Sequence, residues 1–142
     1  MEPDAPWRCA ICGFEQARPI ARLRVSTLAL YDDARFPGRA VLVLDAHATL
    51  VEDLPLETAC DLARDVREAA LAVRAAAGAR RVNYAAFGNV VPHVHVHLVP
   101  RHGPWDTAPR ASPWDHPEPE RPLAPGEADR LFAAIRAALG SG

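Results

Sequence analysis

The sequence predicts a single α+β domain whose core is an antiparallel sheet of about five strands. A length of 142 residues suits one domain, and a hydrophobic fraction of 49% suits one packed core. Between residues 18 and 46, apolar runs of strand length are separated by turn residues, which is the pattern of an antiparallel hairpin or meander. One long helix and a C-terminal helix, both marked by apolar residues at helical spacing, complete the prediction.

The first strands are predicted from short segments rich in aliphatic and β-branched residues. Residues 20–30 mix such residues with polar ones and are interpreted as one or two strands. Residues 31–38 contain two aspartates and a Pro-Gly pair, which together indicate a turn. Residues 40–44 form an apolar run of strand length.

The long helix is predicted over residues 55–77. Pro55 suits the first turn, where a missing N–H costs nothing, and Gly78 suits the C-terminal end. Its apolar stripe, spaced by threes and fours, consists of Leu56, Ala59, Cys60, Ala63, Val66, Ala70, Val73 and Ala77. Because Cys60 lies on this stripe, we expect its thiol in the core.

The second half of the chain predicts two more strands, an arm and a helix. Residues 81–87 and the strongly alternating residues 90–99 are interpreted as strands, separated by Gly88-Asn89. Residues 100–125 are so rich in proline that neither a helix nor a central strand is expected there. The single domain, 1–142, therefore divides into a core (1–103), a Pro/Trp-rich arm (104–125) and a C-terminal helix (126–142).

The composition excludes several classes of function. All 16 basic residues are arginines, so a Schiff-base lysine and a P-loop lysine are both excluded. The formal charge of -2 argues against a nucleic acid polymer as partner, although it permits a single nucleotide. We expect no signal peptide, because the start has neither a basic flank nor an apolar segment, and no apolar run approaches the ~18 residues of a membrane span. We therefore expect a cytoplasmic protein without a membrane partner.

Three histidines at alternate positions form the strongest chemical signal. His93, His95 and His97 fall at i, i+2 and i+4 of a predicted strand, so all three side chains are expected on one face. Across four residues a strand spans about 13 Å, which is too far for all three to share one zinc ion. Neutral imidazole is a good nucleophile near neutral pH, because its ordinary pKa is about 6.5.

These histidines and the segments around them resemble the histidine triad (HIT) superfamily. Residues 83–99 are similar to its signature His-φ-His-φ-His-φ-φ (φ apolar) with the preceding polar loop, and residues 28–47 are similar to its nucleoside-binding hairpin. The resemblance extends over roughly residues 9–101. It implies a HIT-like fold with helices on one side of the sheet, a two-fold homodimer and a small-molecule nucleotide as substrate.

The resemblance also implies catalytic roles for two of the histidines. The middle one, His95, would attack the α-phosphorus of the nucleotide and carry a nucleotidyl-histidine intermediate. His97 would contact the phosphate near the leaving group. Asn89 stands where many members have glutamine, and its amide is one methylene shorter.

Further substrate contacts are expected from residues outside the triad. Asp32 falls where the family holds the ribose hydroxyls, and Asp33 and a plain turn aspartate are the alternatives. Asn83 lies beside the triad and suits either a substrate contact or a strand end. Arg101 suits either a bidentate phosphate contact or an ordinary ion pair.

A second site is indicated by Cys9 and Cys12, a C-x-x-C pair that by itself is half of a zinc site. Many bacterial HIT proteins are similar in this region, and in them the pair is completed by a histidine after the hairpin and by the first histidine of the triad. Those positions are His47 and His93. The resemblance thus implies a structural zinc ion with four protein ligands and no open position.

The expected activity is hydrolysis of AMP conjugates, either dinucleoside polyphosphates or nucleoside phosphoramidates. A histidine at position 97 favours a hydrolase, because the transferase branch that resembles galactose-1-phosphate uridylyltransferase carries glutamine there. A nucleotidyl transferase or phosphorylase, and a non-catalytic zinc-stabilised nucleotide-binding module, remain alternatives. Trp105 and Trp114 of the arm suit either contact with a base, in the same subunit or in a partner subunit, or packing on the arm's own surface.

Overall fold

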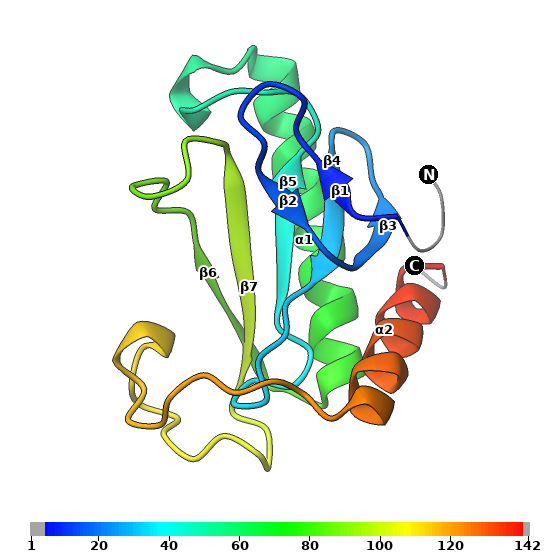
Figure 1. Ribbon diagram of the computed structural model, residues 1–142, viewed down its shortest axis with the longest axis vertical. Coiled ribbons are helices and arrows are strands. Elements are labelled where there is room, and N and C mark those ends of the chain that lie inside the picture. Colours follow the sequence, from blue (N-terminus) through cyan, green and yellow to red (C-terminus); the bar gives the residue numbers. More distant parts are fainter. Residues whose placement is uncertain (1–4, 141–142) are drawn as a thin grey trace.

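The computed structural model describes residues 5–140 and shows the predicted α+β architecture (Figure 1). Its sheet has five antiparallel strands in the order β3-β4-β5-β7-β6, and a separate two-stranded hairpin, β1-β2, precedes it. The elements are β1 (Trp7–Arg8), β2 (Glu15–Gln16), β3 (Pro19–Arg22), β4 (Ser26–Leu30), β5 (Ala40–Leu44), α1 (Leu56–Ala77), β6 (Arg81–Ala85), β7 (His95–Arg101) and α2 (Pro125–Gly140), with short 3-10 helices at Val51–Asp53 and Pro113–Asp115.

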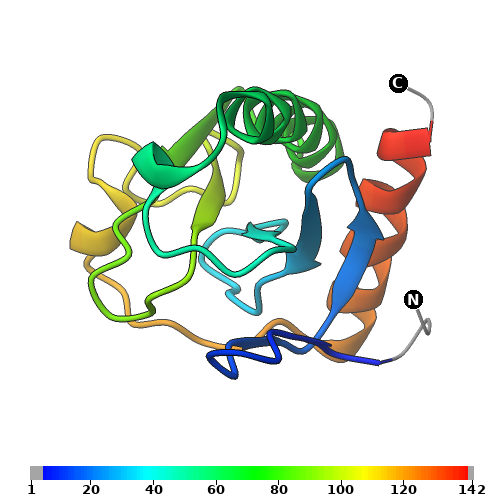
Figure 2. The same ribbon diagram turned by 90° about the horizontal axis from the view of Figure 1, so that it is seen from above.

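The sheet lies between a helix and the chain's irregular segments. Figure 2 shows α1 across one face of the sheet and α2 beside the edge strand β3. The β1-β2 hairpin lies on the opposite face, along which the later part of the arm (orange) also runs. This arrangement leaves β6 as the uncovered edge strand. Neither helix in the described part of the chain combines the length and apolar character that a membrane span requires.

The predicted hairpin region forms three strands. Residues 20–30 contain two of them, β3 and β4, and β5 coincides with the predicted run 40–44. The turn between β4 and β5 packs closely on the end of α1, since a Cβ at Gly38 would lie 3.0 Å from the Cβ of Ala77. Gly38 also has a φ of 101°, which side-chain-bearing residues rarely adopt, so glycine is required there.

The strand that carries the triad is shifted from its predicted position. The expected strand over 90–99 begins only at His95, because residues 90–94 bend and Val94 bonds instead to Ala48 and Leu44. At its other end the strand continues through Pro100, where no central strand was expected. Pro100 is tolerated because β5 pairs with β7 only as far as Leu98, so the missing N–H lies beyond the central part of the sheet.

The buried face of α1 also differs from the predicted stripe. The residues of this helix that are buried are Leu62, Asp65, Ala69, Ala70, Ala72 and Val73. Leu56 is 79% exposed and Cys60 is exposed, so the prediction of a core thiol at Cys60 is wrong. The reason is Asp65, whose carboxylate accepts hydrogen bonds from the N–H groups of Arg24 and Val25 and from the Ser26 hydroxyl, and this turns a polar residue toward the sheet.

The C-terminal helix packs as its pattern predicts. Leu131 and Ile135 of α2 are fully buried, and Ala128, Phe132 and Leu139 pack beside them against the same core. The guanidinium of Arg136 donates to the carbonyl of Ile20 at 2.9 Å, which ties the helix to β3. The edge of β3 is therefore covered, in contrast to that of β6.

Candidate active site and metal centre

His95 is held in one defined tautomer at the start of β7. Its Nδ1 lies 2.6 Å from the carbonyl oxygen of His93. Because a carbonyl only accepts, Nδ1 carries the proton and donates. The neutral ring therefore presents an unprotonated Nε2, the atom that a nucleophilic histidine needs.

His97 lies beside His95 on the same face of β7, with ring centroids 5.3 Å apart. The guanidinium of Arg39 donates to its Nδ1 at 3.3 Å, so the proton of the neutral ring is on Nε2. Burial, together with the positive charge of Arg39 and the neighbouring His95, lowers the pKa of His97 to about 4. At neutral pH this ring is thus an uncharged N–H donor.

Arg39 belongs to a buried charged network behind the histidines. Its guanidinium is 4% exposed, donates to Asp33 at 2.9 Å and lies 3.9 Å from the centre of the Tyr31 ring. Burial alone would raise the pKa of Asp33, but hydrogen bonds from Arg35 and Arg39 outweigh it and hold the pKa below its ordinary value. Asp33, the alternative ribose contact, is fully buried in these ion pairs.

A pocket of about 320 Å³ opens in front of the two histidines. Its wall consists of Phe87, Gly88, Asn89, Val90, Val91, His95, His97 and Trp114. Asn89 thus lines the same pocket as His95 and His97. Gly88 permits this approach because the turn has a φ of 68° at its position.

The two tryptophans of the arm have different positions. Trp114 reaches the site of its own chain, where its ring centroid lies 5.3 Å from that of His97 and 5.2 Å from that of Phe87. The indole N–H of Trp105 instead donates to the carbonyl of Ala77 at the end of α1. Trp105 therefore packs on its own domain, whereas Trp114 lines the pocket in front of the histidines.

Asp32 lines a second pocket, of about 400 Å³. The wall of this pocket consists of Gln16, Ala17, Arg18, Leu30, Tyr31, Asp32, Leu123, Pro125 and Ala128. One carboxylate oxygen of Asp32 accepts from the N–H of Leu123 at 2.7 Å. Tyr31 lies between the two pockets: it lines the second pocket, and the centroid of its ring is 5.9 Å from that of the His97 ring in the first.

Arg101 and Asn83 do not join the triad. The Arg101 side chain is 2% exposed, and its three nitrogens donate to Asp106, Asn83 and the carbonyl of Ala108 at 2.8 to 2.9 Å. The donors predicted for a phosphate are thus used to hold the arm against β6. The prediction of substrate contacts from Arg101 and Asn83 does not fit these positions, and the ion-pair alternative for Arg101 does.

The four predicted metal ligands form a compact cluster. One ligand atom each from Cys9, Cys12, His47 and His93 lies within 4.8 Å of the others. The Sγ atoms of Cys9 and Cys12 approach the Nδ1 atoms of His47 and His93 at 3.6 and 3.5 Å. Two sulfurs and two imidazole nitrogens are a donor set that suits a tetrahedral metal ion, and the cluster can bind one.

The surroundings of the cluster favour metal binding. The Nε2–H of His93 donates to the carbonyl of Leu44 at 2.7 Å, which leaves Nδ1 free on the side of Cys12. The backbone N–H of Cys12 lowers the pKa of the Cys9 thiol to about 6, so its thiolate is available at neutral pH. His93 also joins the two sites, because its carbonyl fixes the ring of His95.

The sequence matches the model of a known family. Residues 16–103 match the family model of the HIT domain, and the chain belongs to this family. Membership supports nucleotide binding together with hydrolase or transferase chemistry. No curated protein matches the chain.

Solved structures of bacterial proteins share the architecture. A histidine triad (HIT) protein from Sinorhizobium meliloti 1021 is 26% identical, with a TM-score of 0.75 over 84% of this chain and 87% of that chain. A histidine triad protein from Bradyrhizobium japonicum is 24% identical, with a TM-score of 0.77 over 85% and 89%. A Zn-bound histidine triad family protein from Mycobacterium smegmatis is 22% identical, with a TM-score of 0.65 over 87% and 84%.

Sequence reasoning missed Arg39 as a neighbour of the triad. A signal for it exists in the strand register: Val41 pairs with His97, and Arg39 lies two residues before Val41 and so on the same face. That register could be read only after the pairing of β5 with β7 was known. The approach of Trp114 has no such local signal, because an irregular arm carries it.

Proposed function

We propose that the chain is a nucleotide hydrolase that acts at the α-phosphorus of AMP conjugates through His95. The observation that carries the proposal is the hydrogen bond from His95 Nδ1 to the carbonyl of His93, which leaves Nε2 free beside the pocket. A solvated surface histidine has no need of a fixed tautomer. A nucleophile needs it, because the attacking lone pair must point at phosphorus.

The proposed reaction has two displacements at phosphorus. His95 Nε2 attacks, a P–N bond to the ring forms, and the bond to the leaving group breaks with its electron pair; the leaving group takes a proton from water. The hydroxide left by that proton transfer then attacks the same phosphorus, the P–N bond to the ring breaks, and its electron pair returns to Nε2. One water molecule is consumed, and AMP and the protonated leaving group are released.

His97 and Asn89 are proposed to hold the phosphate. With a pKa of about 4, His97 is uncharged at neutral pH, so its Nε2–H serves as a hydrogen-bond donor to a phosphate oxygen. A neutral ring is a poor proton donor, and we therefore assign the leaving group's proton to water. Asn89, which lines the same pocket, adds an amide donor.

The nucleoside is proposed to occupy the pocket beside Tyr31. Asp32 is exposed, and one of its two carboxylate oxygens is bonded to the N–H of Leu123. The other oxygen can accept from ribose hydroxyls. Asp33 has no such capacity, because Arg35 and Arg39 occupy its oxygens.

We also propose that the metal of the Cys/His cluster is a structural zinc ion. The four ligands Cys9, Cys12, His47 and His93 all come from protein, so no position is left for a reacting water. The ion would fix the loop that ends at His93, whose carbonyl orients the nucleophile. The Zn-bound relative from Mycobacterium smegmatis supports this choice of metal.

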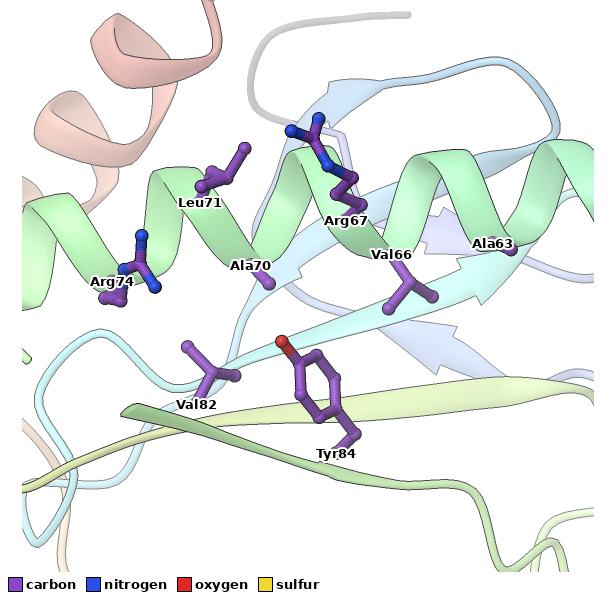
Figure 3. Close-up of a pocket in the computed structure, with 8 residues that line it drawn as sticks. All are labelled: Ala63, Val66, Arg67, Ala70, Leu71, Arg74, Val82 and Tyr84. Atoms are coloured by element: carbon purple, nitrogen blue, oxygen red, sulfur yellow. The ribbon is translucent and has the colours of Figure 1, made fainter. Parts of the chain in front are cut away.

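A two-fold homodimer is proposed to form through the uncovered edge of β6. Tyr84 of β6 is 59% exposed and Leu71 of α1 is 43% exposed. Figure 3 shows that Tyr84 and Val82 line a pocket together with residues of α1. The volume of this pocket is about 240 Å³. A second copy would cover the apolar side chains of this face and pair with the free strand edge.

The proposal is tested by AMP release from adenosine 5′-phosphoramidate and diadenosine tetraphosphate, for the wild type and for His95→Ala. We expect turnover of at least one substrate that falls by several orders of magnitude in the variant. His102→Asn is the matched control, because it removes an imidazole outside the site while asparagine tolerates the φ of 61° there. Equal turnover in His95→Ala and the wild type would refute the mechanism.

A further inference from the structure

Phe14 is an aromatic residue of the N-terminal hairpin that packs on the ring of His95. The centroids of the two rings lie 5.1 Å apart, and the ring planes are inclined at 50°. Phe14 lines neither the pocket in front of the histidines nor the pocket beside Tyr31. Its contact with His95 is therefore made within the protein and is not offered to a ligand in these pockets.

The turn between β1 and β2 fixes the position of this ring. The N–H of Gly13 donates to the carbonyl of Cys9, and the N–H of Cys9 donates to the carbonyl of Phe14, both at 2.9 Å. The partly buried ring of Phe14 also contacts those of Trp7 and His93, with centroids 6.2 and 5.8 Å away. Backbone and side-chain contacts thus hold Phe14 against the proposed nucleophile.

The proposed reaction gives the ring of His95 a positive charge. Nε2 donates its lone pair to phosphorus while the bond to the leaving group breaks with its own electron pair. Nδ1 keeps its proton, because the carbonyl of His93 accepts a hydrogen bond but does not remove the proton. The ring therefore stays cationic until the P–N bond breaks and the electron pair returns to Nε2.

No carboxylate neutralises this charge directly. Within residues 5–140, His116 is the one histidine that has a carboxylate at ion-pair distance, so none pairs with the ring of His95. An aromatic ring can take this part, because its face is negative and attracts a cation within about 6 Å of the ring centre. At an inclination of 50° the two rings do not meet by an edge alone, so part of the face of Phe14 is turned toward the imidazole.

We propose that Phe14 is a positioning residue of the nucleophile. Its ring holds the imidazole of His95 in place and stabilises the positive charge that this imidazole acquires when it bonds to phosphorus. The inference rests on the proposed function and concerns the step that forms the nucleotidyl-histidine. Because Phe14 lines neither pocket, it changes the rate of that step and not the affinity for the nucleotide.

The test replaces Phe14 alone with phenylalanine analogues that carry one, three and five ring fluorines. Fluorine withdraws electrons from the ring face and changes the shape of the ring little, so support by shape alone would be kept. The rate of the first step is measured as kcat/KM for an AMP conjugate that the wild type hydrolyses. We expect it to fall stepwise, by about tenfold with five fluorines, while the Kd for AMP stays unchanged.

Two further variants and a metal assay separate charge stabilisation from other effects. Phe14→Leu keeps an apolar side chain without a ring and should lose about as much activity as the analogue with five fluorines. The same analogues at Phe36, a buried ring that lies 5.3 Å from the guanidinium carbon of Arg101 and lines neither pocket, should leave kcat/KM unchanged. Zinc content is determined for each protein, because Phe14 also contacts His93.

The outcomes distinguish the role of Phe14 from the proposed function. A value of kcat/KM that is constant or rises along the fluorine series, or wild-type activity in Phe14→Leu, would overturn this role and leave the hydrolase proposal standing. A loss of zinc that parallels the loss of rate would also overturn it, because the effect would then arise at the metal centre. Absence of AMP release by the wild type would refute the proposed function, and the role of Phe14 with it.

Discussion

Replacing Arg39 with methionine removes the guanidinium that lies between the buried Asp33 and His97. Methionine keeps an unbranched apolar stem of similar length, so the change mainly deletes charge and donors. Three hydrogen bonds are lost: one to Asp33 at 2.9 Å, one to His97 at 3.3 Å and one to Glu120 at 3.4 Å. Arg35 continues to bind Asp33 through both carboxylate oxygens.

The size of the effect follows from these contacts. Removing one partner of a buried ion pair costs about 3–5 kcal/mol when the remaining charge is left alone. Because Arg35 still neutralises Asp33, we expect a smaller loss, about 2 kcal/mol, which is the value of a hydrogen bond to a charged group. Turnover should fall on the order of 10- to 100-fold, since the ring of His97 loses the donor that fixes its tautomer.

The pKa of His97 gives the sharpest readout. Its value of about 4 lies below the ordinary 6.5, so the fold favours the neutral ring. The unfolded chain therefore binds more protons between pH 4 and 6.5, and the stability that His97 contributes is present above pH 6.5 and is lost as the pH falls to 4. In Arg39→Met the pKa should rise but stay below 6.5, because burial, its largest cause, remains.

The assay is a titration of the histidine ring resonances by NMR, together with urea unfolding at pH 7 and at pH 5. Arg39→Lys is the control, because it keeps the charge near His97 and a partner for Asp33 while it loses the planar fork. It should retain a low pKa and most of the stability. An unchanged pKa of His97 in Arg39→Met would refute the electrostatic reasoning.

Three further predictions concern the metal, a buried carboxylate and the subunit contact. Zinc-loaded protein should show one rapidly reacting thiol, Cys60, and chelation should expose Cys9 and Cys12 as well; three reactive thiols before chelation would contradict the metal centre. Asp65→Ala should cost about 3 kcal/mol in urea unfolding, because it leaves two backbone N–H groups and the Ser26 hydroxyl unpaired, and a loss below 1 kcal/mol would contradict this role. Tyr84→Arg should yield monomers in analytical ultracentrifugation, whereas Arg81→Gln on the same strand should not; a dimer that persists in Tyr84→Arg would place the interface elsewhere.

The elements with strong periodicity were predictable from sequence. The strand at residues 40–44, the helix after Pro55 and the apolar side of the C-terminal helix depend on local patterns, and the structure contains all three. The buried face of α1 was not predictable in the same way. The helix is rich in alanine, which fits either a core or a surface. Hydrogen bonds from the turn at Arg24 and Val25 to Asp65 determine which face of the helix is buried.

The candidate site was predicted unevenly for a related reason. The ligands Cys9, Cys12, His47 and His93 were inferred from a family resemblance, and the structure brings them together. The role of Arg101 depended on its ion-pair partner, which the sequence pattern does not identify. In the structure that partner is Asp106 of the irregular arm. The approach of the arm to the triad is a tertiary contact that no local pattern encodes.

The central claim is that phosphorus is transferred to His95 and then to water, and the stereochemical course at the α-phosphorus tests it most directly. An AMP conjugate made chiral at phosphorus by isotopic oxygen and sulfur would be hydrolysed in labelled water, and the configuration of the product determined by ³¹P NMR. Each in-line displacement inverts the configuration. Two displacements through a histidine intermediate predict overall retention, whereas overall inversion would show a single direct attack by water and contradict the account.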